Sequence, residues 1–119
     1  MPRHTDLGKK GEELAADWLV RNGYEILHRN WRHGRYEVDI IAGRAGVIHM
    51  LEIKCRRSVA YGRPEESVNR KKIGHILQGA SGWLYQFPGH TRVQYDVLAI
   101  TLLKNSEPEY VLFEDVYLY

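Results

Sequence analysis

The sequence predicts an α/β domain, in which helices flank a mixed five-stranded sheet in the order α-β-β-β-α-β-β. Two segments carry apolar residues at helical spacing, and five others are short and rich in β-branched and aromatic residues. A tight turn joins the second and third predicted strands, which predicts an antiparallel hairpin. The connection from the third to the fourth strand holds a helix, and this length predicts a parallel crossover.

The two predicted helices have clear limits. The first begins at a capping residue, Thr5 or Asp6, and runs to about Asn22, where Gly23 ends it. The second covers about 69–86. Each has one apolar stripe, formed by Leu7, Leu14, Ala15, Trp18 and Leu19 in the first helix and by Ile73, Ile76, Leu77, Ala80, Trp83 and Leu84 in the second.

The five predicted strands follow from runs of apolar and aromatic residues bounded by turn residues. They cover residues 24–32, 36–42, 47–55, 92–102 and 110–118. The segment Gly43-Arg44-Ala45-Gly46 between the second and third strands is a hairpin signal. The last strand completes the sheet, and an exposed remainder of it can form the edge of a homodimer.

Length and composition fit one domain over residues 1–119, with 44% apolar and 27% charged residues. These values exclude a disordered tail, a coiled coil and a collagen-like chain. The single cysteine, Cys55, excludes a disulfide framework within the chain and favours a reducing compartment. No apolar run is long enough to span a bilayer, and no signal-peptide core is present, so a cytoplasmic protein is expected.

The net charge of +2 hides an uneven distribution. Residues 28–72 hold 11 basic and 5 acidic side chains, whereas residues 73–119 hold 2 and 5. A basic half indicates an anionic partner, with nucleic acid first, although a solvated charged surface explains the same counts.

Charged residues interrupt the apolar pattern of the hairpin. Because side chains alternate between the faces of a strand, Glu52 and Lys54 share a face of the third strand, and Glu37 and Asp39 share a face of the second. The other face of the second strand is apolar, with Val38, Ile40 and Ala42.

The register of the hairpin decides whether these charges meet. A two-residue turn at Arg44-Ala45 places Glu37 opposite Glu52 and Asp39 opposite Met50, with all the charged residues on one face. A three-residue turn would put Asp39 and Glu52 on opposite faces. The hypothesis of one site therefore needs an even turn or a compensating bulge.

Carboxylates brought this close repel one another, and a divalent cation removes the conflict. Oxygen ligands such as Asp39 and Glu52 suit Mg²⁺ or Mn²⁺. Lys54 beside them can orient a water or meet the charge that develops on a phosphate. The set of residues matches metal-assisted phosphodiester hydrolysis. The alternative is an exposed strand face with a Glu–Lys pair, which is common in antiparallel sheets.

The first helix offers one more carboxylate. Glu12 borders the apolar stripe, whereas Glu13 faces water. Gly8 and Gly11 leave bare backbone beside Glu12, so that the sheet or a phosphate can approach closely. The alternative is that Glu12 is an ordinary acid favoured by the helix dipole.

Together these residues resemble the YraN-like uncharacterised bacterial family, over about residues 8–97. The resemblance rests on Gly8, Gly11-Glu12, Ala15, Leu19, Gly23-Tyr24, Arg29-Asn30, Glu37-Val38-Asp39-Ile40-Ile41-Ala42, Glu52-Ile53-Lys54, Arg56, Gly62, Lys71 and Ala80. That family looks like a branch of the PD-(D/E)XK nuclease superfamily, close to archaeal Holliday-junction resolvases.

The resemblance implies a restriction-endonuclease-like core that binds one or two Mg²⁺ ions. Asp39 matches the metal-binding aspartate of the motif, Glu52 its second acid and Lys54 its lysine. Glu12 matches the helix-borne glutamate of the resolvase branch, and the carbonyl of Ile53 is a further metal ligand by the same analogy.

One residue departs from the family pattern, which has glycine before the first strand acid. Here that position is Tyr36, whose ring can narrow access to Glu37 or stack on a base.

A basic loop follows the predicted site. Arg56, Arg57 and Arg63 lie near Tyr61, and arginine beside an aromatic ring suits contact with phosphates and bases. Lys71 begins the second helix, where the dipole disfavours a cation, so a phosphate contact is expected there too.

Three functions are consistent with this pattern. The first is a metal-dependent endonuclease acting on structured or branched DNA, and the second is a non-catalytic nucleic-acid-binding module on the same fold. The third is a protein-interaction domain with acids as surface decoration. The clustered acids favour the first, since binding alone does not need them.

Overall fold

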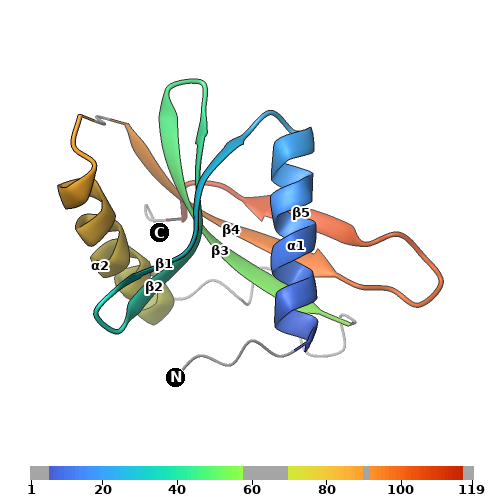
Figure 1. Cartoon of the computed structure of the whole chain (residues 1–119). Coiled ribbons are helices and arrows are strands. Elements are labelled where there is room, and N and C mark those ends of the chain that lie inside the picture. Colours follow the sequence, from blue (N-terminus) through green and yellow to red (C-terminus); the bar gives the residue numbers. More distant parts are fainter. Residues whose placement is uncertain (1–5, 58–69, 90–91, 117–119) are drawn as a thin grey trace.

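The computed structural model describes residues 6–57, 70–89 and 92–116 (Figure 1), and the side chains of residues 7–57, 74–89 and 92–116. The element order is α1 (Asp6–Arg21), β1 (Glu25–His33), β2 (Tyr36–Arg44), β3 (Val47–Arg56), α2 (Arg70–Gln86), β4 (Val93–Thr101) and β5 (Glu109–Phe113). The predicted α/β class and the order α-β-β-β-α-β-β are confirmed. Neither described helix is long and apolar enough to cross a membrane.

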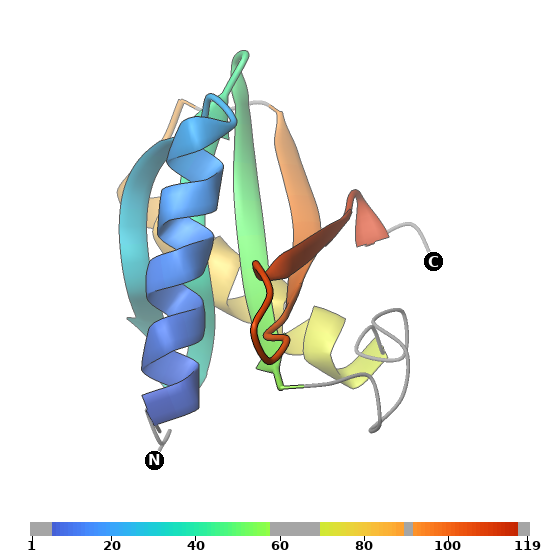
Figure 2. The ribbon, with the colours of Figure 1, turned by 90° about the vertical axis from the view of Figure 1, so that its right-hand side faces the viewer.

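The five strands form one mixed sheet in the order β1-β2-β3-β4-β5. β3 and β4 are parallel, as the crossover predicted, and the other neighbours are antiparallel. Figure 2 shows α1 and α2 on opposite sides of this sheet. Both helices therefore bury one apolar face against it.

Each face of the sheet has its own core. The cluster under α1 contains Ala15, Leu19, Tyr24, Ile40, Ala42, Leu51, Leu98 and Ile100. The cluster under α2 contains Val38, Ile41, Ile48, Met50, Ile76, Ala80 and Trp83. The predicted stripes thus pack as expected for Leu14, Ala15, Trp18 and Leu19 of α1 and for Ile76, Ala80, Trp83 and Leu84 of α2, whereas Leu7 belongs to no core cluster among the described residues.

The hairpin register differs from the prediction by two residues. The turn has two residues, as expected, but they are Ala45 and Gly46, with φ of 52° and 79°, and Arg44 pairs with Val47. A two-residue turn of this kind needs φ > 0 at both central positions, and Gly46 meets that need at the second. The expected turn would have placed Arg44 and Ala45 at the two central positions, and both residues disfavour a positive φ.

This register overturns two predicted pairs. Glu37 does not lie opposite Glu52, and Met50 pairs with Ile41 rather than with Asp39. Continuing the observed register by one step places Asp39 opposite Glu52. The even turn nevertheless keeps these two acids on the same side of the hairpin.

The last strand is shorter than predicted, because β5 ends at Phe113. Beyond it, Asp115 has φ of 59°, and its N–H donates to Asp96 Oδ1 at 2.9 Å. After β5 the chain therefore turns away from the sheet, and its backbone donates a hydrogen bond to the buried carboxylate of Asp96.

α1 approaches the sheet closely at Gly11. A Cβ at this position would lie 2.5 Å from Cys55 Cβ, so no other residue fits without a shift. Cys55, predicted to be a small buried residue, is half-buried here, and burial raises the pKa of its thiol. Gly11 thus sets the distance at which its neighbour Glu12 stands from the sheet.

We expect Gly11→Ala to lower the free energy of unfolding by about 1–3 kcal/mol, because the added methyl overpacks the contact with Cys55. Urea denaturation measures the change. Gly74→Ala is the matched control: an added Cβ there meets no atom of the described residues within 4 Å, so helix propensity should raise stability by about 0.5–1 kcal/mol. Equal stabilities of Gly11→Ala and the parent protein would contradict this close contact.

Candidate active site

The candidate site lies where β2 separates from β3. Their pairing ends at Ile40 and Leu51, after which β1 and β2 bend toward α2 while β3 continues beside β4 (Figure 1). Asp39 is the first residue of β2 past this fork. Its Oδ2 accepts a hydrogen bond from the N–H of Ile53 at 2.8 Å. The carboxylate thereby satisfies a strand donor that β2 no longer reaches.

The alternation of side chains is broken at Asp39. Val38 packs in the α2 cluster together with Ile41, whereas strict alternation would put it on the face of Ile40. The residue of β1 across from Asp39 is Asn30, with φ of 56°. The predicted apolar face of Val38, Ile40 and Ala42 is therefore wrong for Val38, which packs toward α2 instead.

Three carboxylates line one cavity of about 290 Å³ at the fork: Glu37, Asp39 and Glu52. The side chains of Glu52 and Glu37 are 16% and 22% exposed, so both are largely withdrawn from water. The structure thus brings together the strand acids that the sequence indicated, although through a different register.

Two cations stand beside these acids. Lys54 Nζ lies 3.2 Å from Glu52 Oε2, and Arg32 Nη2 lies 4.0 Å from Glu37 Oε2. Glu37 Oε2 is buried and has no hydrogen-bond partner within the described part of the chain. Asp39, by contrast, has its hydrogen bond from the N–H of Ile53.

The acid cluster changes the protonation of Asp39. The pKa of Asp39 is raised from 3.8 to about 7, with burial as the largest cause and the charges of Glu52, Glu37 and Glu12 contributing to the same rise. The N–H of Ile53 acts in the opposite direction. Glu12 of α1 is therefore close enough to act electrostatically on Asp39. Its neighbour Glu13 is exposed and pairs with Arg29 at 3.2 Å.

A profile of the family described as "Uncharacterised protein family UPF0102" matches residues 11–100. The chain belongs to the UPF0102 family. A relative from Trichlorobacter lovleyi, described as a UPF0102 protein, is 44% identical over 104 residues, which cover 86% of this chain and 82% of the relative. Another from Phocaeicola vulgatus, with the same description, is 38% identical over 108 residues, covering 91% and 88%.

Membership of UPF0102 confirms the predicted YraN-like family. The matched span contains all the carboxylates of the candidate site together with Lys54, and it ends before β5. The site is thus part of the region that this chain shares with UPF0102 proteins.

The carboxylates of this UPF0102 chain are chemically suited to Mg²⁺ or Mn²⁺, but they are not arranged as a complete set of metal ligands. Carboxylate oxygens are the ligands these ions prefer, and the buried Glu37 Oε2 has no other hydrogen bond within the described chain. However, no three His, Cys, Asp or Glu side chains in that part of the chain lie close enough together to hold a metal ion as they stand.

The predicted nucleic-acid contacts are only partly described. Arg57 is exposed, and Arg56 is half-buried with its Nη2 lacking a hydrogen-bond partner among the described residues. Arg63 lies outside the described residues. Lys71 lies in α2, and its side chain is likewise not described.

Sequence reasoning missed two residues of the cavity wall, Arg35 and His75, which line it together with Tyr36 and Ile76. Arg35 sits in the β1–β2 turn, and His75 precedes a core residue of α2. The only sequence signal for His75 was its place beside the apolar stripe, which does not reveal what faces it.

Proposed function

We propose that this protein is a metal-dependent endonuclease that hydrolyses phosphodiester bonds in structured, branched or single-stranded DNA, on a PD-(D/E)XK-like core. The observation that carries the proposal is that Asp39 lines one cavity together with Glu37 and Glu52. Burial and the charges of the neighbouring acids raise the pKa of Asp39 to about 7. A perturbed carboxyl in a cavity is typical of a functional site.

The acid cluster would make the metal-free folded protein less stable. Once Asp39 ionises, its carboxylate is withdrawn from water and lies near the charges of Glu52, Glu37 and Glu12, and both effects disfavour the folded state. A hydrophobic residue at position 39 would avoid that cost, and the neighbouring cluster under α2 is built from such residues. A bound divalent cation would turn the repulsion into attraction, so the acids make sense as ligands.

Each residue has a proposed role. Asp39, Glu52 and the carbonyl of Ile53 would hold Mg²⁺ or Mn²⁺, with Glu37 and Glu12 close enough to contribute. When bound, such an ion acts as a Lewis acid and lowers the pKa of a coordinated water. Lys54 is fixed by Glu52 at 3.2 Å, so that it can orient the attacking water or stabilise charge on the phosphate. Arg56, Arg57, Arg63 and Lys71 would bind neighbouring phosphates.

The direct test is incubation with labelled linear, branched and single-stranded DNAs, with Mg²⁺, with Mn²⁺ and with chelator. Cleavage that requires the metal supports the proposal. Calorimetric titration with Mn²⁺ in the absence of DNA tests the metal site independently of chemistry.

A second candidate is a non-catalytic DNA-binding module in the cytoplasm. The observation in its favour is that no three ligating side chains are preassembled among the described residues. DNA binding without cleavage of any substrate, in protein that also fails to bind Mn²⁺, would select this candidate.

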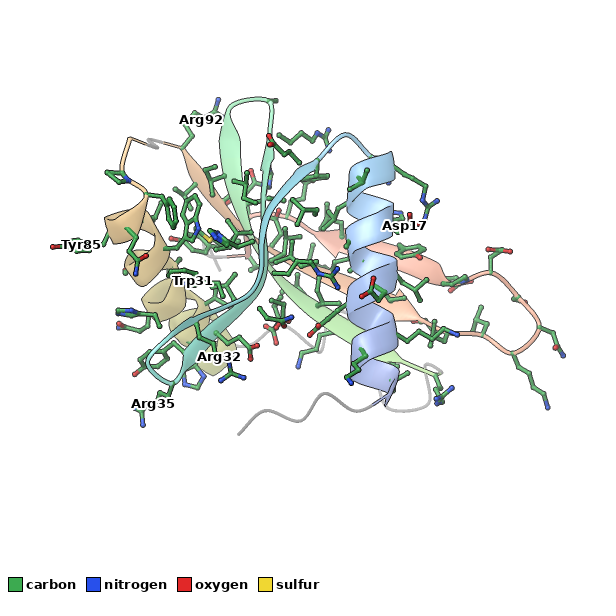
Figure 3. The ribbon with its side chains drawn as sticks, viewed as in Figure 1. Asp17, Trp31, Arg32, Arg35, Tyr85 and Arg92 are labelled. Carbon is green, nitrogen blue, oxygen red and sulfur yellow. The ribbon has the colours of Figure 1, made fainter. Side chains whose placement is uncertain are left out.

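Both candidates predict that DNA affinity falls steeply with salt, because bound basic side chains displace condensed counterions. Anisotropy titrations over a range of KCl concentrations measure the slope. Arg57→Ala should reduce the magnitude of the slope of log affinity against log salt concentration by about one. Arg92→Ala is the control, since Arg92 is an exposed arginine at the other end of the sheet (Figure 3). A flat response to salt would favour the protein-interaction function instead.

A further inference from the structure

An aromatic and cationic wall borders the acid cavity. Tyr36 at the start of β2 and His75 of α2 have ring centres 5.5 Å apart, tilted by 56°. The Arg35 guanidinium lies 5.3 Å from the centre of the Tyr36 ring, and its Nη2 donates to Tyr36 Oη at 3.3 Å. All three side chains line the same cavity as Glu37, Asp39 and Glu52. The carboxylates and the rings therefore face one space.

This wall is not part of the hydrophobic core. Tyr36 is only half-buried, His75 and Arg35 are exposed, and none of them belongs to the clusters under either helix. The nearby Trp31 shows the contrast, since it packs against the α2 cluster and donates its ring N–H to the carbonyl of Gly79 at 3.0 Å. Packing thus accounts for Trp31 but not for Tyr36 and His75.

The volume of the cavity and the chemistry of its side chains limit what can occupy it. At about 290 Å³ it is at the small end of ligand sites, so it suits a single group rather than a stacked duplex. An aromatic face accepts any nucleobase by stacking, and an arginine over a tyrosine ring, as Arg35 is here, is attracted both to the ring and to a phosphate. The carboxylates repel an anion, so a neutral base is the part of a nucleotide that this wall favours.

We propose that Tyr36, supported by His75 and Arg35, stacks an unpaired base beside the acid cluster, and so makes this protein prefer unpaired DNA over continuous duplex. This inference rests on the proposed function, because it assigns the substrate class of that same site. A base inside a duplex is already stacked on both faces, and extracting it carries a free-energy cost that a single strand avoids.

The test measures binding without metal, so that it does not depend on cleavage. A single-stranded oligonucleotide containing 2-aminopurine reports stacking by fluorescence quenching, and anisotropy gives the affinities for that strand and for a blunt duplex in the presence of EDTA. We expect Tyr36→Leu to weaken single-strand binding about tenfold and to abolish the quenching, with duplex affinity changed less than twofold. His75→Ala should have a smaller effect in the same direction.

Two further variants separate stacking from damage to the fold. Tyr36→Phe keeps the ring and should retain both affinity and quenching. Tyr85→Leu is the matched control, because Tyr85 is 88% exposed on α2 and points away from the sheet (Figure 3). Equal weakening of single-strand and duplex binding by Tyr36→Leu, or no weakening of either, would overturn the inference.

The outcomes also separate this inference from the proposed function. Binding that depends on the Tyr36 ring in a protein that never cuts would uphold base stacking and reject the nuclease. A protein that cuts with metal, but whose Tyr36→Leu variant binds and cuts single strands and duplex as the parent does, would uphold the nuclease and reject base stacking.

Discussion

Asp39→Asn should abolish metal-dependent cleavage, with a loss of at least about a thousandfold, while DNA affinity changes less than threefold. The amide keeps the size of the side chain, and its oxygen can still accept the Ile53 N–H, but the charge that would hold a divalent ion is gone. Binding depends instead on cationic side chains such as that of Arg57. Loss of one negative charge reduces the repulsion of phosphates, so a slight gain in affinity is expected. Cleavage and gel-shift assays on one substrate, with and without Mg²⁺, measure both effects.

The control for this variant is Asp17→Asn on α1. Asp17 is 68% exposed and pairs with Arg21, one turn further along the helix, at 3.1 Å (Figure 3). This control makes the same chemical change outside the cavity and should cut as the parent does. An Asp39→Asn protein that retains the parent rate would remove Asp39 from the metal site, and a parent that binds without cutting would favour the binding module.

The fold could be predicted because its main signals are local. The apolar stripes, the stop at Gly23 and the crossover between β3 and β4 all follow from spacing and length, and each is confirmed. The end of β5 could not be predicted, because it depends on a partner distant in sequence. Asp96 is completely buried and holds His49 at 2.8 Å as well as the N–H of Asp115. Nothing near Phe113 reveals that contact.

The candidate site was predicted in composition but not in geometry. The acids alternate along their strands, so an even turn was enough to bring Asp39 and Glu52 together. The point at which β2 and β3 stop pairing was not predictable, because no local pattern in the sequence marks it. The raised pKa of Asp39 was not predictable either, since burial is its largest cause. A sequence pattern shows which residues are neighbours along a strand, but it does not show how deeply a side chain is buried.

The stability of the metal-free protein should fall as the pH rises from about 4 to about 7, and Asp39 should be a main cause. Its pKa is about 7 in the folded protein and 3.8 ordinarily, so in this range the folded chain binds more protons than the unfolded chain. Ionisation of Asp39 therefore favours unfolding. The full shift corresponds to about 4 kcal/mol, and partial exposure of the side chain should reduce the measured effect to about 2–3 kcal/mol. Urea denaturation in EDTA at a series of pH values measures it.

Asp39→Asn should flatten this part of the pH profile and be more stable than the parent above about pH 7, because it has no charge to desolvate. Asp17→Asn should leave the profile parallel to that of the parent, since its carboxylate is exposed. Mn²⁺ should stabilise the parent more at high pH than at low pH, because a ligand must lose its proton before it binds a metal. Asp39→Asn should lose this stabilisation. If the two aspartate variants have parallel profiles, Asp39 ionises as an ordinary surface carboxylate, and the argument that its burial needs a cation fails.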